Sequence, residues 1–349
     1  MKIAIVSPLE IRVPPVAYGG TELVVNELCD ELVHRGHDVT LFASGDSITN
    51  ARLVSVVPEY LRKSNSNPRF FSLLNMVKCY ERAESFDIIH NHIAADGLLL
   101  AGMSKIPTLT TLHSPLHGDE NLAFKFYSGW YNTISKSAQP MLPKKKNYVG
   151  TIYNGIDCSK YPFDKSKRGG YLLYFSRFSP EKGAHLAIKV ARKLKRQLVL
   201  AGNLADKEYF RKEIQPYVDG KMIRSEIEVD DHRKKQLMAN ADCLLAPLLW
   251  DEPFGLFMIE ALACGTPVIA FNRGSVPELI SDHETGFVVD SVDELIDSIG
   301  KISSISPRVC RERVLKNFDA KVMTDNYLTA YRGIITQNIN SAPKLVVKK

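Results

Sequence analysis

The chain has 349 residues, 24% charged and 45% hydrophobic, a balance that supports a packed core and excludes a disordered or fibrous protein. Its formal net charge of +6 is spread along the chain without long blocks of like charge, so we expect no nucleic acid partner. Its six cysteines are scattered with no CxxC pair, which favours a reducing cytoplasm over a zinc site or a disulfide framework.

The amino-terminal apolar run, at 3–6, is too short for a signal peptide or a membrane span and instead predicts a strand. From there, short β-rich runs alternate with segments of helical periodicity, which is typical of βα units in a parallel sheet. In the first half we predict a helix at 21–34, capped by Thr21, and strands at 2–7, 38–44, 53–57, 87–92 and 108–113. In the second half we predict strands at 171–176, 197–202, 222–229, 243–247, 267–271 and 285–289, and helices at 181–194, 207–217, 231–241 and 254–263.

The segment 154–170 is polar and carries Gly, Pro and charge, which predicts a linker between two domains. We therefore expect an α/β fold with an amino-terminal domain at 1–154, a linker at 155–169 and a carboxyl-terminal domain at 170–319. Ligands of doubly wound sheets bind at the carboxyl ends of the strands, so two facing domains would share one central cleft.

The densest motif lies at 251–280, where Glu252 and Glu260 stand eight residues apart around a helix start expected near Phe254. Amide groups at such a start suit a phosphate, and Gly255 lets a ligand approach the backbone. The two carboxylates suit the hydroxyls of a sugar and a ribose. The alternative is that Glu252 caps the helix and Glu260 lies on the surface.

A second motif, SRFSPEKG at 176–183, places Arg177 after a strand and Lys182 before a helix. Two cations on such a turn can neutralise a diphosphate leaving group, while a solvated surface turn is the alternative. In the first half, Gly19 and Gly20 open a helix after a strand and could cradle an anion or form a plain tight turn. The segment lacks the GxGxxG fingerprint and no P-loop follows, so NAD and Walker-type ATP sites lack support.

Three histidines, His90, His92 and His113, lie at the ends of two predicted strands. No carboxylate or cysteine stands beside them at a ligand-like spacing and the chain has no Asp-x-Asp, so we expect no metal. We interpret His113 as a hydrogen-bonding residue of the cleft, and a buried structural role is the alternative for His90. The lysine run at 144–146 is either a solvated loop or a weak attachment to anionic lipid.

Together these motifs resemble the family 4 retaining glycosyltransferases, which have the GT-B architecture of two facing Rossmann-like domains. The resemblance covers nearly the whole chain. It rests on the order of the matching segments, which are YGGTE at 18–22, the runs at 31–47, 87–92, 111–114 and 152–157, SRFSPEKG at 176–183, and EPFGLFMIE at 252–260 with its GTPVIA continuation.

The resemblance implies a role for each motif residue. Arg177 and Lys182 would grip the donor diphosphate, Glu252 and His113 would contact the sugar, and Glu260 would hold the nucleotide ribose. The remaining donor-binding residues would be Gly19, Gly20, Phe254, Gly255 and Leu256. Members of this family commonly work without metal, and their last helix, here 320–337, often returns to complete the first domain.

The implied reaction transfers a hexose-type sugar from a nucleotide diphosphate sugar to an acceptor hydroxyl with retention of configuration. The acceptor class stays open between glycans, lipid-linked molecules and small metabolites, and we expect its binding loops around 65–71 and 117–130. Two other functions remain alternatives, because the same fold supports nucleotide-sugar epimerases and a catalytically silent nucleotide-sugar-binding subunit. The predicted location is the cytoplasm, with weak contact to the cytoplasmic membrane face through the lysine run as an option.

Overall fold

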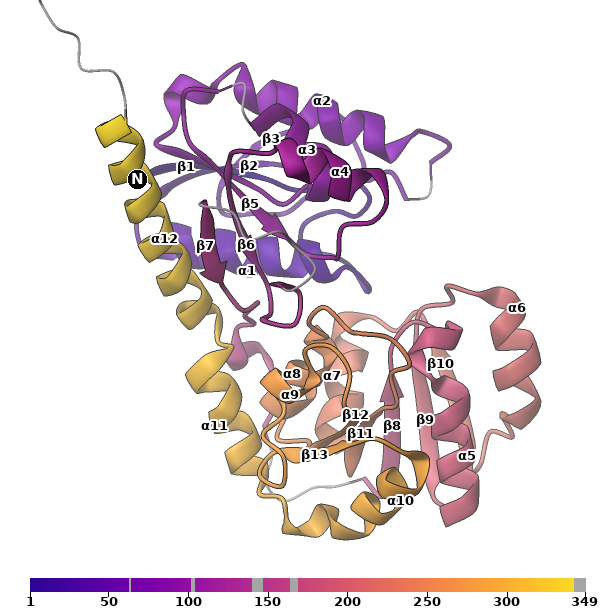
Figure 1. The fold of residues 1–349 in the computed structure, drawn as a ribbon. Helices are drawn as coiled ribbons and strands as arrows, with labels where there is room; N and C mark the ends of the chain where they lie inside the picture. Colours follow the sequence, from indigo (N-terminus) through magenta and orange to yellow (C-terminus); the bar gives the residue numbers. More distant parts are fainter. Residues whose placement is uncertain (63, 102–103, 140–146, 164–168, 342–349) are drawn as a thin grey trace, which may run out of the picture.

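The computed structural model describes residues 1–62, 64–101, 104–139, 147–163 and 169–341, which form two α/β domains (Figure 1). All the strand pairs of both sheets are parallel. The first sheet contains β1 (Lys2–Val6), β2 (Asp38–Phe42), β3 (Arg52–Val54), β4 (Ile88–Asn91), β5 (Thr108–Leu112), β6 (Trp130–Thr133) and β7 (Tyr148–Thr151). The second contains β8 (Tyr171–Phe175), β9 (Gln197–Gly202), β10 (Ile223–Ile227), β11 (Cys243–Ala246), β12 (Val268–Phe271) and β13 (Gly286–Val289).

Both sheets have the doubly wound strand order. The first runs β3-β2-β1-β4-β5-β6-β7 and the second runs β10-β9-β8-β11-β12-β13. The order therefore reverses between β1 and β4 in one sheet and between β8 and β11 in the other, and ligands of such sheets bind beside these reversals. The predicted class, two Rossmann-like domains, is confirmed.

Helices cover both faces of the sheets. Along β1, Ile3 and Ile5 pack on one face and Ala4 and Val6 on the other, which is the two-residue alternation of a strand buried on both sides. The helices of the first domain are α1 (Gly20–His34), α2 (Pro68–Tyr80), α3 (Ala94–Ala101) and α4 (Asp119–Phe126). The second half of the chain adds α5 (Ala184–Leu194), α6 (Lys207–Tyr209), α7 (Asp231–Asn240), α8 (Leu256–Ala263), α9 (Val276–Leu279), α10 (Val292–Lys301), α11 (Pro307–Asn317) and α12 (Ala320–Ser341).

Several elements differ from the sequence predictions. Strands β6 and β7 were not predicted, because WYNT and YVGT mix polar with apolar residues and give no clear period. The expected loops at 65–71 and 117–130 instead contain the start of α2 and all of α4. Asn67 caps α2 by accepting a hydrogen bond from the Arg69 amide at 3.1 Å, and Pro68 occupies the first turn.

Some predicted boundaries were also wrong. Thr21 does not cap α1, because this helix begins at Gly20 after an N-cap at Gly19. The strand predicted at 53–57 ends at Val54. The single helix predicted at 207–217 is split into α6, a π-helical turn at Phe210–Ile214 and a 3-10 turn that contains Pro216, whose missing amide cannot continue the helix.

Helix α12 runs from the second domain back along the first (Figure 1). The crossing is held where the Ile156 amide donates to the Phe318 carbonyl at 3.0 Å and the Ala320 amide donates to the Ile156 carbonyl at 2.9 Å. Beyond it, Tyr327 and Tyr331 are fully buried in the same hydrophobic cluster as α1 and β1. The chain therefore passes twice between the domains, and α12 supplies core side chains to the first.

We expect Tyr327→Ala to destabilise the first domain by about 3 to 5 kcal/mol, because it removes a fully buried aromatic side chain. Tyr327→Phe keeps the ring and should cost only about 1 kcal/mol for the lost hydrogen bonds. Urea unfolding followed through Trp130, in a Trp250→Phe background, isolates this domain because the chain has two tryptophans. Equal stabilities of the alanine variant and its parent would contradict the packing of α12.

Candidate functional site

A cavity of about 220 Å³, the interdomain cavity, lies between the carboxyl ends of the two sheets. Its lining residues all follow strands: Pro115 after β5, Ser137 and Ala138 after β6, Asp251, Glu252 and Pro253 after β11, and Gly274 after β12. Since ligands of parallel sheets bind at this edge, the interdomain cavity is the candidate site, and the predicted central cleft is confirmed.

A buried ion pair joins Lys182 to Glu252 beside this cavity. Lys182 ends a 3-10 turn after β8, and Glu252 follows β11, so the pair spans the point where the strand order reverses. Trp250 donates its indole N–H to Glu252 Oε2 at 3.1 Å, and Lys182 Nζ lies 4.4 Å from the centre of the Trp250 ring. Burial lowers the pKa of Lys182, and the charge of Glu252 acts in the opposite direction.

The loop that carries Glu252 is held by its neighbours after β12. The Ser275 amide donates to the Glu252 carbonyl at 2.9 Å, and the Ser275 hydroxyl donates to the Phe254 carbonyl at 2.7 Å. Gly274 has a φ of +54°, and a Cβ there would lie 2.4 Å from both the amide nitrogen and the carbonyl oxygen of Glu252. Close backbone packing therefore requires glycine at this position.

Helix α8 begins two residues later than predicted. Its first residue is Leu256, and Gly255 is the N-cap with a φ of +83° and no side-chain capping bond. The alternative in which Glu252 caps this helix is wrong. Phe254 is buried, and its ring packs against Tyr153 at 6.3 Å and Phe318 at 6.1 Å between centroids.

Glu260 lies inside the second domain rather than on its surface, so that alternative is also wrong. Its Oε1 accepts hydrogen bonds from the Tyr161 hydroxyl at 2.8 Å and from Lys234 Nζ at 2.6 Å. Burial lowers the pKa of Lys234, but the carboxylates of Glu260 and Asp231 have the larger opposite effect, so this pKa is raised overall. The sequence did not reveal Tyr161 and Lys234 as partners. Tyr161 lies in the predicted linker, and Lys234 lies in a charged run that is typical of an exposed helix.

Arg177 follows β8, is partly exposed, and places Nη2 3.4 Å from Glu181 Oε1. The turn after it is buried at Phe178 and Lys182. Gly183 has a φ of +75°, and a Cβ there would lie 2.0 Å from the Pro247 carbonyl oxygen. Because this turn packs so tightly on the segment after β11, the alternative of a solvated surface turn is wrong.

The start of α1 meets the start of α8 across the domain boundary. A Cβ on Gly20 would lie 3.4 Å from Leu256 Cδ1, and one on Gly19 would lie 2.8 Å from Pro15 Cβ. Two helix amino termini, each a source of amide donors, therefore lie close together.

Glu22, in the first turn of α1, is a buried carboxyl that sequence reasoning did not single out. Burial raises the pKa of Glu22 to about 7, the carboxylate of Glu10 acts in the same direction, and Arg62 opposes them. The YGGTE motif contained this residue, but no local pattern marked it as buried.

His113 follows β5 and is partly exposed, whereas His92 and His90 are buried. His113 Nε2 lies 2.8 Å from His92 Nδ1, and His92 Nε2 lies 3.3 Å from His90 Nδ1. Burial lowers the pKa of all three imidazoles, that of His113 to about 4. His90 is buried, as its alternative interpretation expected, and within the described ranges no group of three or more His, Cys, Asp or Glu side chains could hold a metal ion.

Glu278 of α9 forms a contact between the domains that the sequence did not reveal. Its carboxylate accepts hydrogen bonds from the Lys136 and Ser137 amides, each at 2.8 Å, and from the Tyr153 hydroxyl at 2.9 Å. Ser137 also lines the interdomain cavity, so this contact fixes one of its walls.

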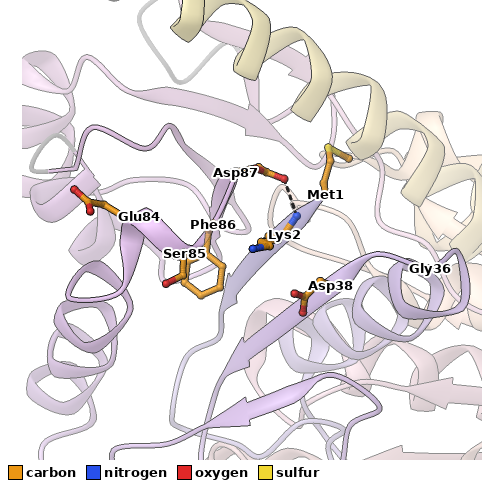
Figure 2. A pocket seen from close by; sticks show the side chains of 8 residues that line it. All are labelled: Met1, Lys2, Gly36, Asp38, Glu84, Ser85, Phe86 and Asp87. Atoms are coloured by element: carbon orange, nitrogen blue, oxygen red, sulfur yellow. Dashed lines mark hydrogen bonds between the residues drawn. The ribbon is translucent and has the colours of Figure 1, made fainter.

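A second hollow, of about 340 Å³, lies at the opposite edge of the first sheet (Figure 2). It is lined near the amino ends of β1 and β2 by Lys2 and Asp38, and the Lys2 amide donates to Asp87 Oδ2 at 2.8 Å. Because parallel sheets bind ligands at their carboxyl ends, this hollow is not part of the candidate site.

The lysines at 144–146 lie outside the described residues, so their predicted lipid contact is untested. No helix in the part of the chain that the structure describes has the length and apolar content needed to cross a membrane.

Comparisons with known proteins cover both domains. Residues 18–160 match the family model "Glycosyltransferase Family 4", and residues 160–314 match "Glycosyl transferases group 1". The chain is 24% identical over 395 residues to glycogen synthase of Mycobacterium tuberculosis (strain CDC 1551 / Oshkosh), covering 92% of this chain and 93% of that one.

Solved structures match over nearly the whole length. AviGT4, a glycosyltransferase involved in avilamycin A biosynthesis, matches with a TM-score of 0.76 and 24% identity over 96% of this chain and 98% of that one. Anabaena HepE in complex with UDP and glucose matches with a TM-score of 0.74 and 19% identity over 95% of this chain and 99% of that one.

We expect the stability of the protein relative to its Glu22→Gln variant to depend on pH. The pKa of Glu22 in the folded protein is raised to about 7. Its contribution to the free energy of unfolding is therefore largest below the ordinary glutamate pKa and is lost as the pH rises towards 7. The Tm difference, variant minus parent, should therefore grow between about pH 5 and about pH 8. For the exposed control Glu81→Gln, the Tm difference should change less with pH. A Tm difference for Glu22→Gln that stays constant with pH would contradict the shifted pKa.

Proposed function

The chain belongs to the family 4 glycosyltransferases of GT-B fold, which transfer sugar from a nucleotide sugar, and from this premise we propose its finer activity. We propose that it transfers a hexose-type sugar from a nucleotide diphosphate sugar to an acceptor hydroxyl, with retention of configuration and without bound metal. The observation that carries the proposal is the buried Lys182–Glu252 pair, which holds a cation and a sugar-binding carboxylate together at the strand reversal of the second sheet.

In this proposal the second domain, 170–319, binds the donor. Arg177 and Lys182 contact the diphosphate, and the amides of Phe254, Gly255 and Leu256 contact sugar and phosphate at the start of α8. Glu252 accepts hydrogen bonds from sugar hydroxyls. Among the described residues, both hydrogen bonds to the Glu260 carboxylate end on Oε1, so Oε2 is the atom that we assign to the ribose.

The main catalytic contribution is electrostatic. Negative charge grows on the diphosphate as the bond to the anomeric carbon breaks, and cations already in place stabilise that charge without reorganisation. Burial strengthens the effect, because Lys182 lies where little water screens its charge. The Glu252 carboxylate opposes the lowering of the Lys182 pKa by burial and orients this side chain before the donor arrives.

In this proposal the first domain, 1–154 with helix α12, binds the acceptor. Gly19 and Gly20 let the acceptor or the diphosphate approach the start of α1, and His113 contacts the sugar. Glycans, lipid-linked molecules and small metabolites all present a suitable hydroxyl. In front-face attack, the acceptor oxygen bonds to the anomeric carbon on the side that the phosphate leaves, and a phosphate oxygen takes the acceptor proton.

UDP is the first donor nucleotide to test, because Anabaena HepE binds UDP and glucose in the same fold. We place the enzyme in the cytoplasm, and its six buried cysteines fit a reducing compartment.

Thermal unfolding with UDP, GDP, ADP, dTDP and CDP, alone and as sugar conjugates, tests the donor site. A ligand at about 100 times its Kd adds roughly 2.7 kcal/mol, so one nucleotide should raise the Tm by a few degrees. The shift should disappear in Arg177→Ala and persist in the exposed control Arg308→Ala. No shift with any nucleotide would contradict the donor site.

Lys182→Ala should lower kcat by at least about 100-fold, the scale of losing one preorganised contact to a developing charge. Lys193→Ala removes an exposed lysine from α5 of the same domain and should leave kcat unchanged. Steady-state kinetics with the donor found above measures both, and circular dichroism checks folding. A folded Lys182→Ala enzyme with the parent kcat would remove this side chain from the mechanism.

Glu252→Gln should abolish most transfer and weaken binding of the nucleotide sugar more than binding of the free nucleotide diphosphate, because this carboxylate contacts the sugar directly and the diphosphate only through Lys182. Titration calorimetry with the nucleotide and with its sugar conjugate separates the two effects. Equal weakening of both ligands would contradict the assignment. Release of an altered sugar nucleotide by the parent enzyme without any acceptor would instead indicate an epimerase.

A further inference from the structure

Trp250 contacts both members of the ion pair beside the interdomain cavity. Its indole N–H donates to Glu252 Oε2 at 3.1 Å, and the centre of its ring lies 4.4 Å from Lys182 Nζ. Lys182 in turn donates to the same Glu252 Oε2. The three side chains therefore touch one another, yet the proposed function gives a role only to Lys182 and Glu252.

The chain on both sides of Trp250 is held in place. The Leu249 amide donates to the Glu181 carbonyl at 2.8 Å. On the other side, Asp251 Oδ1 accepts from the Gly274 amide at 3.1 Å. The Trp250 ring itself is partly buried and packs against the hydrophobic core of the second domain. Its position is therefore set by long-range contacts of that domain.

The two oxygens of the Glu252 carboxylate differ in what binds them. Within the part of the chain that the structure describes, both hydrogen bonds to this carboxylate, from Lys182 and from Trp250, end on Oε2. Glu252 also lines the interdomain cavity, so the other oxygen, Oε1, is the acceptor that a ligand in the cavity can use. A carboxylate oxygen accepts from a hydroxyl and repels an anionic phosphate, which matches Oε1 to a sugar.

We propose that Trp250 is a positioning residue whose indole N–H holds Glu252 with Oε1 towards the transferred sugar, and whose ring supports the Lys182 ammonium at the diphosphate. The inference rests on the proposed function and adds a residue that determines how firmly the sugar is held. The two contacts come from different parts of one side chain, the N–H edge and the ring face. Substitutions can therefore remove them separately.

Donor binding explains why Glu252 needs a second partner. As the Lys182 ammonium binds the diphosphate, the negative charge of the phosphates competes with Glu252 for it. The indole N–H of Trp250 is uncharged and is only a donor, and the fold holds its ring in place, so it stays bound to Glu252 Oε2. The electron-rich face of the ring meanwhile stabilises the ammonium beside it.

The indole ¹H–¹⁵N NMR signal of Trp250 tests the contact with Glu252 without any substrate. The chain has two tryptophans, so the signal lost in Trp250→Phe is assigned to this residue. A carboxylate moves a bound N–H proton further downfield than a neutral amide does, so Glu252→Gln should shift the signal upfield, and the exposed control Glu81→Gln should not. We expect the signal to stay downfield when the nucleotide diphosphate identified by thermal unfolding binds. An unshifted signal in Glu252→Gln, or the position of a free indole after nucleotide binding, would overturn the proposal.

Titration calorimetry tests the effect on the sugar. Trp250→Phe keeps a ring beside Lys182 but removes the N–H, so we expect the nucleotide sugar to bind about tenfold more weakly, the scale of one hydrogen bond. The affinity of this variant for the free nucleotide diphosphate should stay close to that of the parent. Trp250→Leu also removes the aromatic face and should weaken binding of the free nucleotide diphosphate as well. Trp130→Phe, the same change in the first sheet, should alter neither affinity.

The outcomes separate positioning from a merely structural role. Equal weakening of both ligands in Trp250→Phe would mean that the side chain only stabilises its loop, and parent affinities for both would mean that Glu252 needs no such support. Either result overturns the proposal. Binding of no nucleotide sugar by the parent enzyme would instead overturn the proposed function. The indole signal distinguishes these failures, because its dependence on Glu252 is measured in the unliganded protein.

Discussion

The ion pair between Lys182 and Glu252 is the interaction on which the candidate site depends. Each charge would be costly to bury alone, and each offsets that cost for the other. Through this pair, the turn after β8 and the loop after β11 are tied together where the strand order reverses. Gly183 and Gly274 allow the backbones of neighbouring loops to pack closely against these segments. The position of the cationic and acidic groups is therefore a property of the folded second sheet and not of one loop.

The site also depends on how the two domains meet. Glu278 holds the segment after β6 with two hydrogen bonds and accepts a third from Tyr153, Gly20 lies beside Leu256, and α12 returns to the first domain. The first of these contacts fixes one wall of the interdomain cavity, because Ser137 lines it. Because each contact joins residues distant in sequence, the arrangement exists only when both sheets are folded. Movement between the domains would change the cavity without altering either core.

Buried polar networks lie inside both domains. Glu260 bonds to Tyr161 and Lys234 in the second, and His90 bonds to Thr111 and Tyr331 in the first. Each network satisfies polar groups that water cannot reach, and a satisfied network has few alternative arrangements. Glu260, which is proposed to reach the ribose, is thus oriented by buried partners.

By itself, the sequence determined the two parallel α/β domains and the motif positions, because continuous apolar runs, helical periods and glycine turns are local patterns. It did not show β6 and β7, whose residues are polar in part, or the helices that replace the expected loops at 65–71 and 117–130. Only the tertiary structure decided the partners of the site residues. Tyr161 lies 99 positions from Glu260, and His90 lies 241 positions from Tyr331, so no local pattern could pair them. Burial, hydrogen bonding and the shifted pKa values of Glu22 and His113 follow from those long-range contacts.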